Sequence, residues 1–349
     1  MMESQQANRK NEHLSLAIAS FKQAHTHHYF NQIRLIHNAL PEMSTTDVDP
    51  RVQLGPHLHL EWPFYLEAMT GGSNQAMKVN RTLAHQAARH HLAIATGSLS
   101  IAIREPATRP SFTVVREEDP AGLVFANLSA GTSLQAAQTA IKLLHADALE
   151  LHLNAAQELT MMEGDRNFHW IDNIKCLVKA LPVPIIVKEV GFGMSQQTIR
   201  RLLAAGVRYI NISGRGGTNF ALIENRRSHG LGLPELNKWG QTTPESLLEA
   251  RVIKDPSPTI IASGGIINPL DVIKAGVLGA QTVGVAGYFL NILIRHGENA
   301  LDEELCRWQE EILRLLTLLG CQRFTDLSHR VDFVLQGDLY DYARQRKLI

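Results

Sequence analysis

The stretch LHLNAAQE (151–158) carries an imidazole, two carboxamides and a carboxylate after an apolar run typical of a strand. His152 and Asn154 are two residues apart, so on a strand their side chains point to the same side. Gln157 and Glu158 are expected in the loop that follows. An isolated histidine and asparagine would satisfy each other and nearby backbone groups. Four polar groups at one strand end, however, are costly to desolvate unless they meet a polar or charged ligand.

Glu158 is the candidate metal ligand. A single carboxylate suits Mg²⁺, a hard cation that takes one or two carboxylates together with phosphate oxygens and water. The three cysteines, Cys176, Cys306 and Cys321, form no C-x-x-C pair, which argues against a zinc site and against a disulfide framework. A magnesium ion at Glu158 would neutralise a diphosphate.

Two glycine-rich segments are candidates for binding phosphate. IASGGI (261–266) and VGVAGYF (283–289) each end a strand-like run. Backbone N–H groups at such loops and at helix N-termini bind phosphate groups. Either segment alone indicates an ordinary tight turn equally well. At adjacent strand ends, the two together predict a site for the phosphate of a substrate or of a cofactor such as FMN.

Lys188, in VKEV, ends a further strand-like run. A lysine there can form a Schiff base if desolvated, or act as a fixed positive charge near a flavin ring or a phosphate. The alternative is a salt bridge to Glu189 or to another acidic residue. MTGG (69–72), Ser98 and Asn127 end three other runs with small or hydrogen-bonding residues. Such a wall suits a planar ring with polar edges.

Eight short apolar or β-branched segments must position these groups. They are 64–71, 92–98, 123–129, 148–154, 184–190, 209–213, 259–265 and 282–287. Segments with helical periodicity lie between them, including 133–146, 195–206 with Ser195 as N-cap, and 268–280 with Asn268 as N-cap. Alternating strands and helices predict parallel strands joined by right-handed crossovers.

The predicted fold is α/β, a single (β/α)₈ TIM barrel with an N-terminal extension and C-terminal helices. An open doubly wound sheet is the alternative, because it alternates strands and helices in the same way. Polar residues end nearly every candidate strand, which favours the barrel. The barrel is expected over 61–298, a partly helical extension over 1–60 and outer helices over 299–349. The long connection 214–259 is rich in Gly and Arg, as lids often are.

Composition limits the partners of the chain. Its 349 residues hold 34 Lys plus Arg and 34 Asp plus Glu, so no overall basic charge favours nucleic acid. The N-terminus is polar before any apolar run, and no segment reaches the roughly 18 apolar residues of a membrane span. We expect a soluble, unprocessed, cytoplasmic protein that binds neither nucleic acid nor membrane.

The chain resembles the type-2, FMN-dependent isopentenyl-diphosphate isomerases. The matching stretches are RKNEHL (9–14), HNALPE (37–42), AMTGG (68–72), TGS (96–98), LHLNAAQE (151–158), VKEVGFGMS (187–195), ISGRGGTNF (212–220), IE (223–224) and SGGI (263–266). They span nearly the whole chain in the family's order. LHLNAAQE followed by KEVGFG distinguishes this family among flavin-binding barrels.

The resemblance implies roles for particular residues. Substrate would be bound by Arg9, Lys10, His13, His152, Asn154 and Gln157, and Mg²⁺ by Glu158. FMN would be bound by Met69, Thr70, Gly71, Ser98, Asn127, Lys188, Ser213, Thr218, Gly264, Gly265, Ala286 and Gly287. The catalytic residues would be Gln157, His152 and Lys188.

The sequence departs from the family at one point. Many members continue the Gly-Ser of the second strand with Gln-Arg, whose arginine touches the diphosphate, whereas this chain has Leu99 and Ser100. Either Arg104 or an N-terminal residue is expected to replace that arginine, or the diphosphate is bound more weakly.

The implied activity is the isomerisation of isopentenyl diphosphate to dimethylallyl diphosphate in isoprenoid biosynthesis. One proton is added at the terminal methylene carbon and another is removed from the second carbon, without net redox change. The resemblance implies that FMN acts in its reduced form, that NADPH primes it, and that Mg²⁺ is required. It also implies a homo-oligomer, either a tetramer or an octamer.

Two other functions remain open. An FMN-dependent 2-hydroxy-acid oxidase on the same fold needs an imidazole after the sixth strand, where this chain has Arg215. A non-catalytic barrel that binds FMN or a phosphorylated ligand is the other alternative. The presence of His152, Gln157, Glu158 and Lys188 together favours an enzyme.

Overall fold

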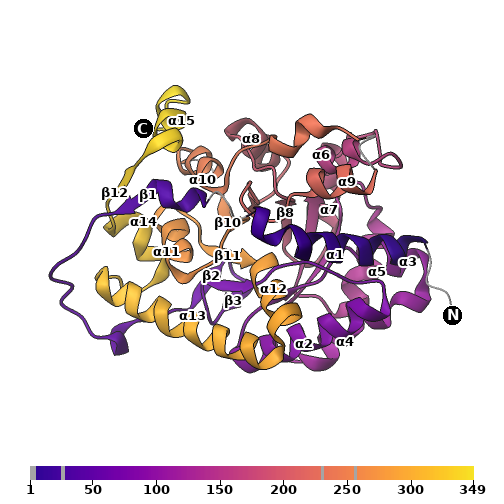
Figure 1. The fold of residues 1–349 in the computed structure, drawn as a ribbon, viewed down its shortest axis with the longest axis horizontal. Helices are drawn as coiled ribbons and strands as arrows, with labels where there is room; N and C mark the ends of the chain where they lie inside the picture. The colour runs from indigo at the N-terminus through magenta and orange to yellow at the C-terminus, as the bar shows by residue number, and fades with distance from the viewer. Residues whose placement is uncertain (1–4, 25–27, 229–231, 255–257) are drawn as a thin grey trace.

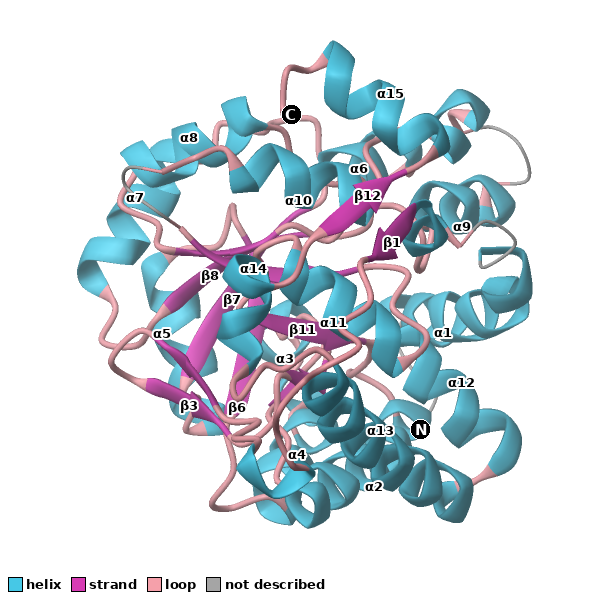
Figure 2. Cartoon of the chain, turned by 90° about the vertical axis from the view of Figure 1, so that its left-hand side faces the viewer, coloured by secondary structure: helices cyan, strands magenta, loops and turns pink. Residues whose placement is uncertain are grey.

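A closed ring of eight parallel strands forms the centre of the molecule (Figures 1 and 2). The computed structural model describes residues 5–24, 28–228, 232–254 and 258–349. The barrel strands are β4 (Phe64–Leu66), β5 (Ile94–Ala95), β6 (Val124–Ser129), β7 (Ala148–Leu153), β8 (Ile185–Glu189), β9 (Tyr209–Asn211), β10 (Thr259–Ser263) and β11 (Thr282–Val285). Because β11 pairs with β4, the ring closes. The predicted TIM barrel is confirmed, and the open sheet is wrong.

Helices surround the ring on its outer side (Figure 2). They are α2 (Asn74–His90), α3 (Ser100–Arg104), α4 (Pro110–Glu118), α5 (Leu134–Leu144), α6 (Ala155–Thr160), α7 (Ile171–Ala180), α8 (Gln196–Ala204), α9 (Phe220–Arg227), α10 (Thr243–Arg251), α11 (Pro269–Val277) and α12 (Gly287–His296). Side-chain caps fix several starts. Ser195 accepts from the Thr198 N–H, and Asn268 Oδ1 accepts from the Asp271 N–H at 3.0 Å. Both predicted N-caps are therefore confirmed.

The segment before the barrel closes the barrel's N-terminal end. The hairpin of β2 (Val52–Leu54) and β3 (Leu58–Leu60) turns at Gly55, where φ is +63° and an added Cβ would lie 2.0 Å from the Tyr209 hydroxyl oxygen. Tyr209 begins β9. Leu54 and Leu58 are completely buried, so the hairpin seals the end of the barrel opposite to the strands' C-terminal ends.

The C-terminal segment packs outside the barrel. It contains α13 (Glu298–Leu318), α14 (Leu327–Arg330), β12 (Phe333–Leu335) and α15 (Gly337–Gln345). The apolar face of α13, which includes the fully buried Trp308, packs against α2, α11 and α12. β12 pairs antiparallel with β1 (Ile33–Leu35), which joins the two ends of the chain. The expected outer helices are present, accompanied by this short strand.

Helix α1 (Gln5–Ala24) lies across the molecule above the barrel, next to α9 and α12 (Figure 1). Its Lys10 Nζ donates to the Ser98 carbonyl oxygen at 2.8 Å, and Arg227 of α9 pairs with Glu12 at 3.2 Å. These contacts place the N-terminal extension over the C-terminal ends of the strands. In the part of the chain that the structure describes, no helix is long and apolar enough to span a membrane.

Candidate active site

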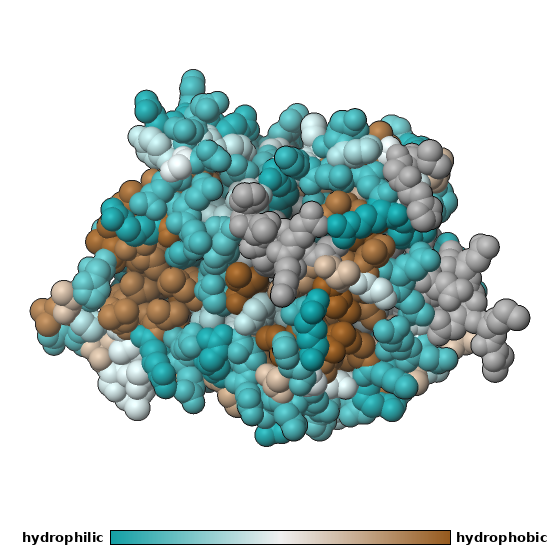
Figure 3. All heavy atoms as spheres, viewed as in Figure 1, coloured by the Kyte–Doolittle hydropathy of each residue, from teal (hydrophilic) through white to brown (hydrophobic). Residues whose placement is uncertain are grey.

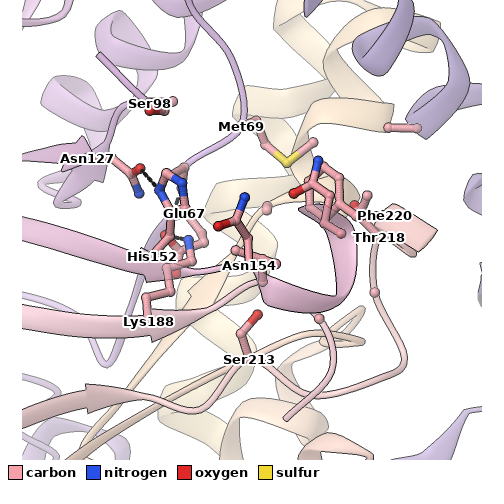
Figure 4. A pocket seen from close by; sticks show the side chains of 18 of the residues that line it. Glu67, Met69, Ser98, Asn127, His152, Asn154, Lys188, Ser213, Thr218 and Phe220 are labelled. Carbon is pink, nitrogen blue, oxygen red and sulfur yellow. Dashed lines mark hydrogen bonds and ion pairs between the residues drawn. The ribbon is translucent and has the colours of Figure 1, made fainter. Parts of the chain in front are cut away.

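A cavity of about 740 Å³ opens at the C-terminal ends of the barrel strands. Every strand end contributes to its wall, which is the usual place for the site of a TIM barrel. The contributing residues are Met69 and Thr70 after β4, Ser98 after β5, Asn127 on β6, His152 on β7, Lys188 on β8, Ser213 after β9, Gly264 and Gly265 after β10, and Ala286 and Gly287 after β11. Figure 4 shows several of these side chains around the cavity.

The His152 ring is held by a chain of hydrogen bonds. Its Nδ1 lies 2.9 Å from Asn127 Oδ1, and Asn127 Nδ2 donates to Glu150 Oε2 at 2.8 Å (Figure 4 marks the first contact). With the amide oriented this way, Nδ1 carries the ring proton and Nε2 keeps a lone pair. Burial, together with the charges of Lys188 and Lys10, lowers the pKa of His152 to about 3. The imidazole is therefore neutral at physiological pH.

Lys188 is paired with two buried carboxyl groups. Its Nζ lies 2.6 Å from Glu67 Oε1 and 3.7 Å from Glu150 Oε2. Burial opposes the charge on Lys188, but both carboxyl groups outweigh it and raise the pKa of the amine above its usual value. A permanently charged amine is a poor Schiff-base nucleophile, so this geometry favours the role of a fixed positive charge.

The alternative that Lys188 forms a salt bridge to an acidic residue is confirmed, although its partner is not Glu189. The Glu189 carboxylate accepts from the backbone N–H groups of Val190 and Gly191, both at 2.7 Å, and so holds the loop after β8. Lys188 lines the cavity in addition to making its ion pair. The salt bridge and the cavity role therefore occur together.

Glu158 and Asn154 form a polar edge of the cavity. Glu158 lies in the short helix α6, so the expected loop position of Gln157 and Glu158 is wrong: the chain turns into a helix directly after β7. Glu158 accepts from Asn154 Nδ2 at 2.8 Å and from the Asp165 N–H at 2.7 Å. Asn154 Oδ1 is buried without a hydrogen-bond partner among the described residues. An orphaned oxygen beside a carboxylate fits a hydrated cation or a ligand donor.

Gln157 contacts a buried carboxylate, that of Glu224, which the sequence alone did not indicate as a site residue. Its Nε2 donates to Glu224 Oε1 at 2.9 Å, and Arg227 donates to the other oxygen of Glu224. Glu224 is 1% exposed and lies on α9, behind Gln157 as seen from the cavity. IE (223–224) was among the matching stretches, but the contact joins residues that are 67 positions apart.

Two basic residues from helices outside the barrel strands also line the cavity. Lys10 lines the cavity from α1, and Arg104 lines it from the last position of α3, one helical turn after Ser100. Arg104 Nε donates to the Ser100 carbonyl oxygen at 3.2 Å. Leu99 is fully buried and belongs to the core. Arg104 therefore shares a helical face with the position where the family's arginine is expected.

The opposite side of the cavity is suited to a phosphate group. The N-terminus of α12 has no side-chain cap, and its first residues line the cavity. Gly264 and Gly265 have φ of +93° and +78°, and a Cβ on Gly264 would lie 2.1 Å from the Gly214 oxygen. Only glycine fits there. Uncapped N–H groups and a helix dipole favour an anion at this position.

Most predicted site residues line the cavity. Three are exceptions: Gly71 does not line it, and the side chains of Arg9 and His13 are not described. Gly71 is absent from the wall and packs against the Phe112 ring, from which an added Cβ would lie only 2.1 Å. The side chains of Arg9 and His13 lie outside the described residues, although both positions belong to α1. The expectation that Arg9 and His13 bind the substrate therefore stays a prediction.

The residues present fit both FMN and Mg²⁺. FMN needs a phosphate cradle, a long wall of hydrogen-bonding groups and a positive charge, and α12, the strand ends and Lys188 supply them. Mg²⁺ needs few protein ligands. The described residues contain no cluster of three or more metal-binding side chains, so Glu158 would hold the ion with ligands from water and phosphate. Thr218 also lines the cavity, as predicted for a flavin contact.

Comparison with known proteins defines the class first. The model of the FMN-dependent dehydrogenase family matches residues 102–332. A solved structure of a mandelate oxidase variant with (S)-mandelic acid matches with a TM-score of 0.67 at 17% identity, and covers 95% of this chain and 96% of that one. At this identity the likeness shows the fold alone. The chain is thus an FMN-dependent barrel protein.

Sequence relatives then define the family within that class. The isopentenyl-diphosphate delta-isomerase of Limosilactobacillus reuteri subsp. reuteri (strain JCM 1112) is 63% identical over 348 residues, which is 100% of both chains. That of Latilactobacillus sakei subsp. sakei (strain 23K) is 45% identical over 345 residues, 98% of this chain and 97% of the relative. The chain belongs to the type-2, FMN-dependent isopentenyl-diphosphate delta-isomerase family, which confirms the resemblance.

Proposed function

We propose that the protein converts isopentenyl diphosphate into dimethylallyl diphosphate, with FMN in its reduced form and with Mg²⁺. The observation that carries the proposal is the presence of two anion-binding regions on opposite sides of one cavity. The phosphate cradle follows β10 and β11, whereas Glu158 follows β7, four places from β11 in the ring of eight strands. One region suits the phosphate of FMN, and the other suits a diphosphate.

The diphosphate is held at the edge formed by α1, α3 and α6. Lys10 and Arg104 supply positive charge there, and Glu158 supplies the carboxylate for Mg²⁺. Asn154, whose Oδ1 has no hydrogen-bond partner in the described part of the chain, faces the same edge. Binding energy from the diphosphate then orients the reacting carbons, which are remote from the charge.

Bound reduced FMN supplies the group that exchanges protons with the alkene. The protein's own residues determine the surroundings of that exchange. His152 is a neutral imidazole whose tautomer is set by Asn127. Gln157 is an amide and a poor base, but it is bonded to the carboxylate of Glu224. Lys188 provides a fixed positive charge at the cavity wall.

Arg215 argues against the 2-hydroxy-acid oxidase. It stands after β9, where an oxidase needs an imidazole. Its guanidinium donates to the carbonyl oxygens of Lys238 and Gly240 and to the Tyr29 hydroxyl, at 2.9, 3.2 and 2.7 Å, away from the cavity wall. Among the described residues, His152 is the only imidazole on that wall, and it stands on β7 and not after β9. Isomerisation therefore fits the site better than oxidation.

The proposal includes NADPH as the reductant that primes FMN, a cytoplasmic location, and assembly into a homo-oligomer. An apolar surface supports the last point. Ile36, Leu270 and Leu318 are 46%, 40% and 45% exposed, and they lie beside a hollow between β1, α11 and α13. Figure 3 shows an apolar area over these elements on the left of the molecule.

An anaerobic assay tests the proposed activity. The protein is mixed with isopentenyl diphosphate, Mg²⁺ and chemically reduced FMN, and the substrate and product are followed by proton NMR. Dimethylallyl diphosphate is expected with reduced FMN and not with oxidised FMN. If no product forms while FMN remains bound, the isomerase proposal fails and the oxidase and scaffold alternatives return.

A further inference from the structure

Four buried polar side chains meet beside the cavity, whose wall includes two of them, Glu67 and Lys188. Tyr65 and Glu67 come from β4 and the residue that follows it, Glu150 comes from β7 and Lys188 from β8; their exposed fractions are 0%, 5%, 0% and 6%. The group contains two carboxyl groups and one cation. Two buried carboxylates this close to each other repel strongly unless one of them holds a proton.

The hydrogen bonds around Glu67 show that it is the ionised partner. Its Oε1 receives Lys188 Nζ at 2.6 Å and the Ala68 N–H at 2.8 Å. Its Oε2 receives the Tyr65 hydroxyl at 2.8 Å and Asn211 Nδ2 at 2.6 Å. Four donors leave no room for a proton on this carboxyl group. The charge of Lys188 outweighs the effect of burial and lowers the pKa of Glu67.

The surroundings of Glu150 favour the protonated form. Asn127 Nδ2 donates to its Oε2, while its Oε1 faces the Tyr65 hydroxyl oxygen at 3.5 Å. The single proton of that hydroxyl is directed to Glu67, and the Tyr65 oxygen accepts from Asn211 Nδ2 at 3.2 Å, so its remaining lone pair is the one available towards Glu150. A proton on Glu150 Oε1 converts this repulsion into a hydrogen bond. Burial and the charge of Glu67 raise the pKa of Glu150 to about 8.

The charge of this cluster reaches the cavity by two routes. Lys188 and Glu67 line the wall directly, and Asn127 links Glu150 to His152. With one proton present, Glu67 balances Lys188 and the cluster carries no net charge. When that proton is released to solvent, the cluster becomes negative beside a cavity that must accept anions.

We propose that the pair of Glu67 and Glu150 holds a single proton at neutral pH, carried by Glu150, and that both act as positioning residues, so that proton loss in alkaline solution adds a negative charge beside Lys188 at the wall of the flavin cavity. The presence of this proton depends only on the described side chains. The consequence for the flavin rests on the proposed function. Reduction adds electrons to FMN, so a negative cluster opposes it and lowers the reduction potential.

Unfolding measurements between pH 5 and 9 test for the proton on Glu150 without substrate. The folded chain keeps a proton on Glu150 that the unfolded chain loses near pH 4.5, so stability falls as pH rises from there to about 8. Glu150→Gln mimics the protonated group and removes this dependence. The unfolding constant of the parent protein, divided by that of Glu150→Gln, should rise about tenfold per pH unit in this window. A constant ratio would overturn the proposal.

A matched control separates the effect of Glu150 from the effect of replacing an exposed carboxyl group. Glu117 is exposed on α4, so the unfolding constant of Glu117→Gln should equal that of the parent protein at every pH.

Infrared difference spectroscopy detects the proton on the carboxyl group directly. One protonated-carboxyl band of the parent protein should be present at pH 7, disappear in alkali, and be missing from Glu150→Gln, in which any band of Glu189, whose pKa burial also raises to about 8, remains. The Glu150 band should also be absent from Glu67→Gln, because Glu150 then becomes the ionised partner of Lys188. A Glu150 band that persists in Glu67→Gln contradicts the proposal.

Potentiometry on the FMN-loaded protein tests the expected effect on the reduction potential of the flavin. Through the alkaline transition the midpoint potential should fall more steeply with pH in the parent protein than in Glu150→Gln. Parallel curves would overturn the positioning role even if the infrared band were present. Absence of isomerase activity with the band and the steeper slope intact would instead defeat the proposed function alone. The two failures are therefore distinguishable.

Discussion

Gln157 donates its side-chain amide to the buried carboxylate of Glu224 across 2.9 Å, and so connects the cavity to an acid on a different helix. An amide is a poor base, so Gln157 needs such a group if it is to take part in moving a proton. Glu224→Gln should therefore lower kcat about 100-fold, with little change in KM, because the diphosphate contacts remain. Steady-state kinetics under anaerobic conditions check this.

The control for Glu224 is Glu12→Gln. Glu12 pairs with the same Arg227 at 3.2 Å but has no bond to Gln157. This variant should keep the parent kcat, since only the arginine's surroundings change. Equal losses in both variants would show that Glu224 acts by holding Arg227 and not through Gln157.

Glu158 is expected to set the requirement for Mg²⁺. Glu158→Gln keeps the size of the side chain but removes the charge that a hard cation needs. The Mg²⁺ concentration for half-maximal activity should rise at least about tenfold, while the content of bound FMN stays that of the parent protein. Titration of activity with Mg²⁺ tests this, and an unchanged midpoint would exclude the metal role.

Lys188 is expected to contact the flavin in addition to its two acidic partners, Glu67 and Glu150. Lys188→Ala should be purified pale, or should bind FMN more weakly, because the fixed positive charge at the cavity wall is lost. The flavin absorbance per chain measures this, with circular dichroism to confirm folding. Lys175 is exposed on α7, so Lys175→Ala serves as the control. A normal flavin content in Lys188→Ala would refute the contact.

Arg104 is expected to replace the arginine that the family carries one helical turn earlier. Arg104→Ala should raise KM for isopentenyl diphosphate about tenfold, since one charged hydrogen bond to the diphosphate is lost. Ser100 lies on the same face of α3 and lines the cavity. Adding Ser100→Arg to Arg104→Ala should restore KM. If the second substitution brings no recovery, the diphosphate does not lie along this face.

The barrel could be predicted because its signals are local. Each strand is a short apolar run, and capping residues such as Ser195 and Asn268 mark where helices begin. Pairing between distant segments leaves no such signal. The β1–β12 sheet pairs Ile33 with Leu335, and neither short run contains a pattern that identifies its partner strand.

The candidate site could be predicted where residues follow one another along a strand. His152 stands out because Asn154, Gln157 and Glu158 are close to it in the sequence. Glu150 shares the same strand face two positions earlier and could have been found by extending that spacing, as could Glu67 from Tyr65. Their contacts with each other depend on how the closed ring places β4 and β7, which the sequence pattern does not specify.

The decisive measurement is the reaction in deuterium oxide, run anaerobically with isopentenyl diphosphate in large excess over reduced FMN. We expect many turnovers per flavin, deuterium from solvent in the newly formed methyl group of dimethylallyl diphosphate, and flavin that is still reduced at the end. Flavin that is oxidised once per product formed, or product without solvent deuterium, would contradict isomerisation by proton addition and removal at this site.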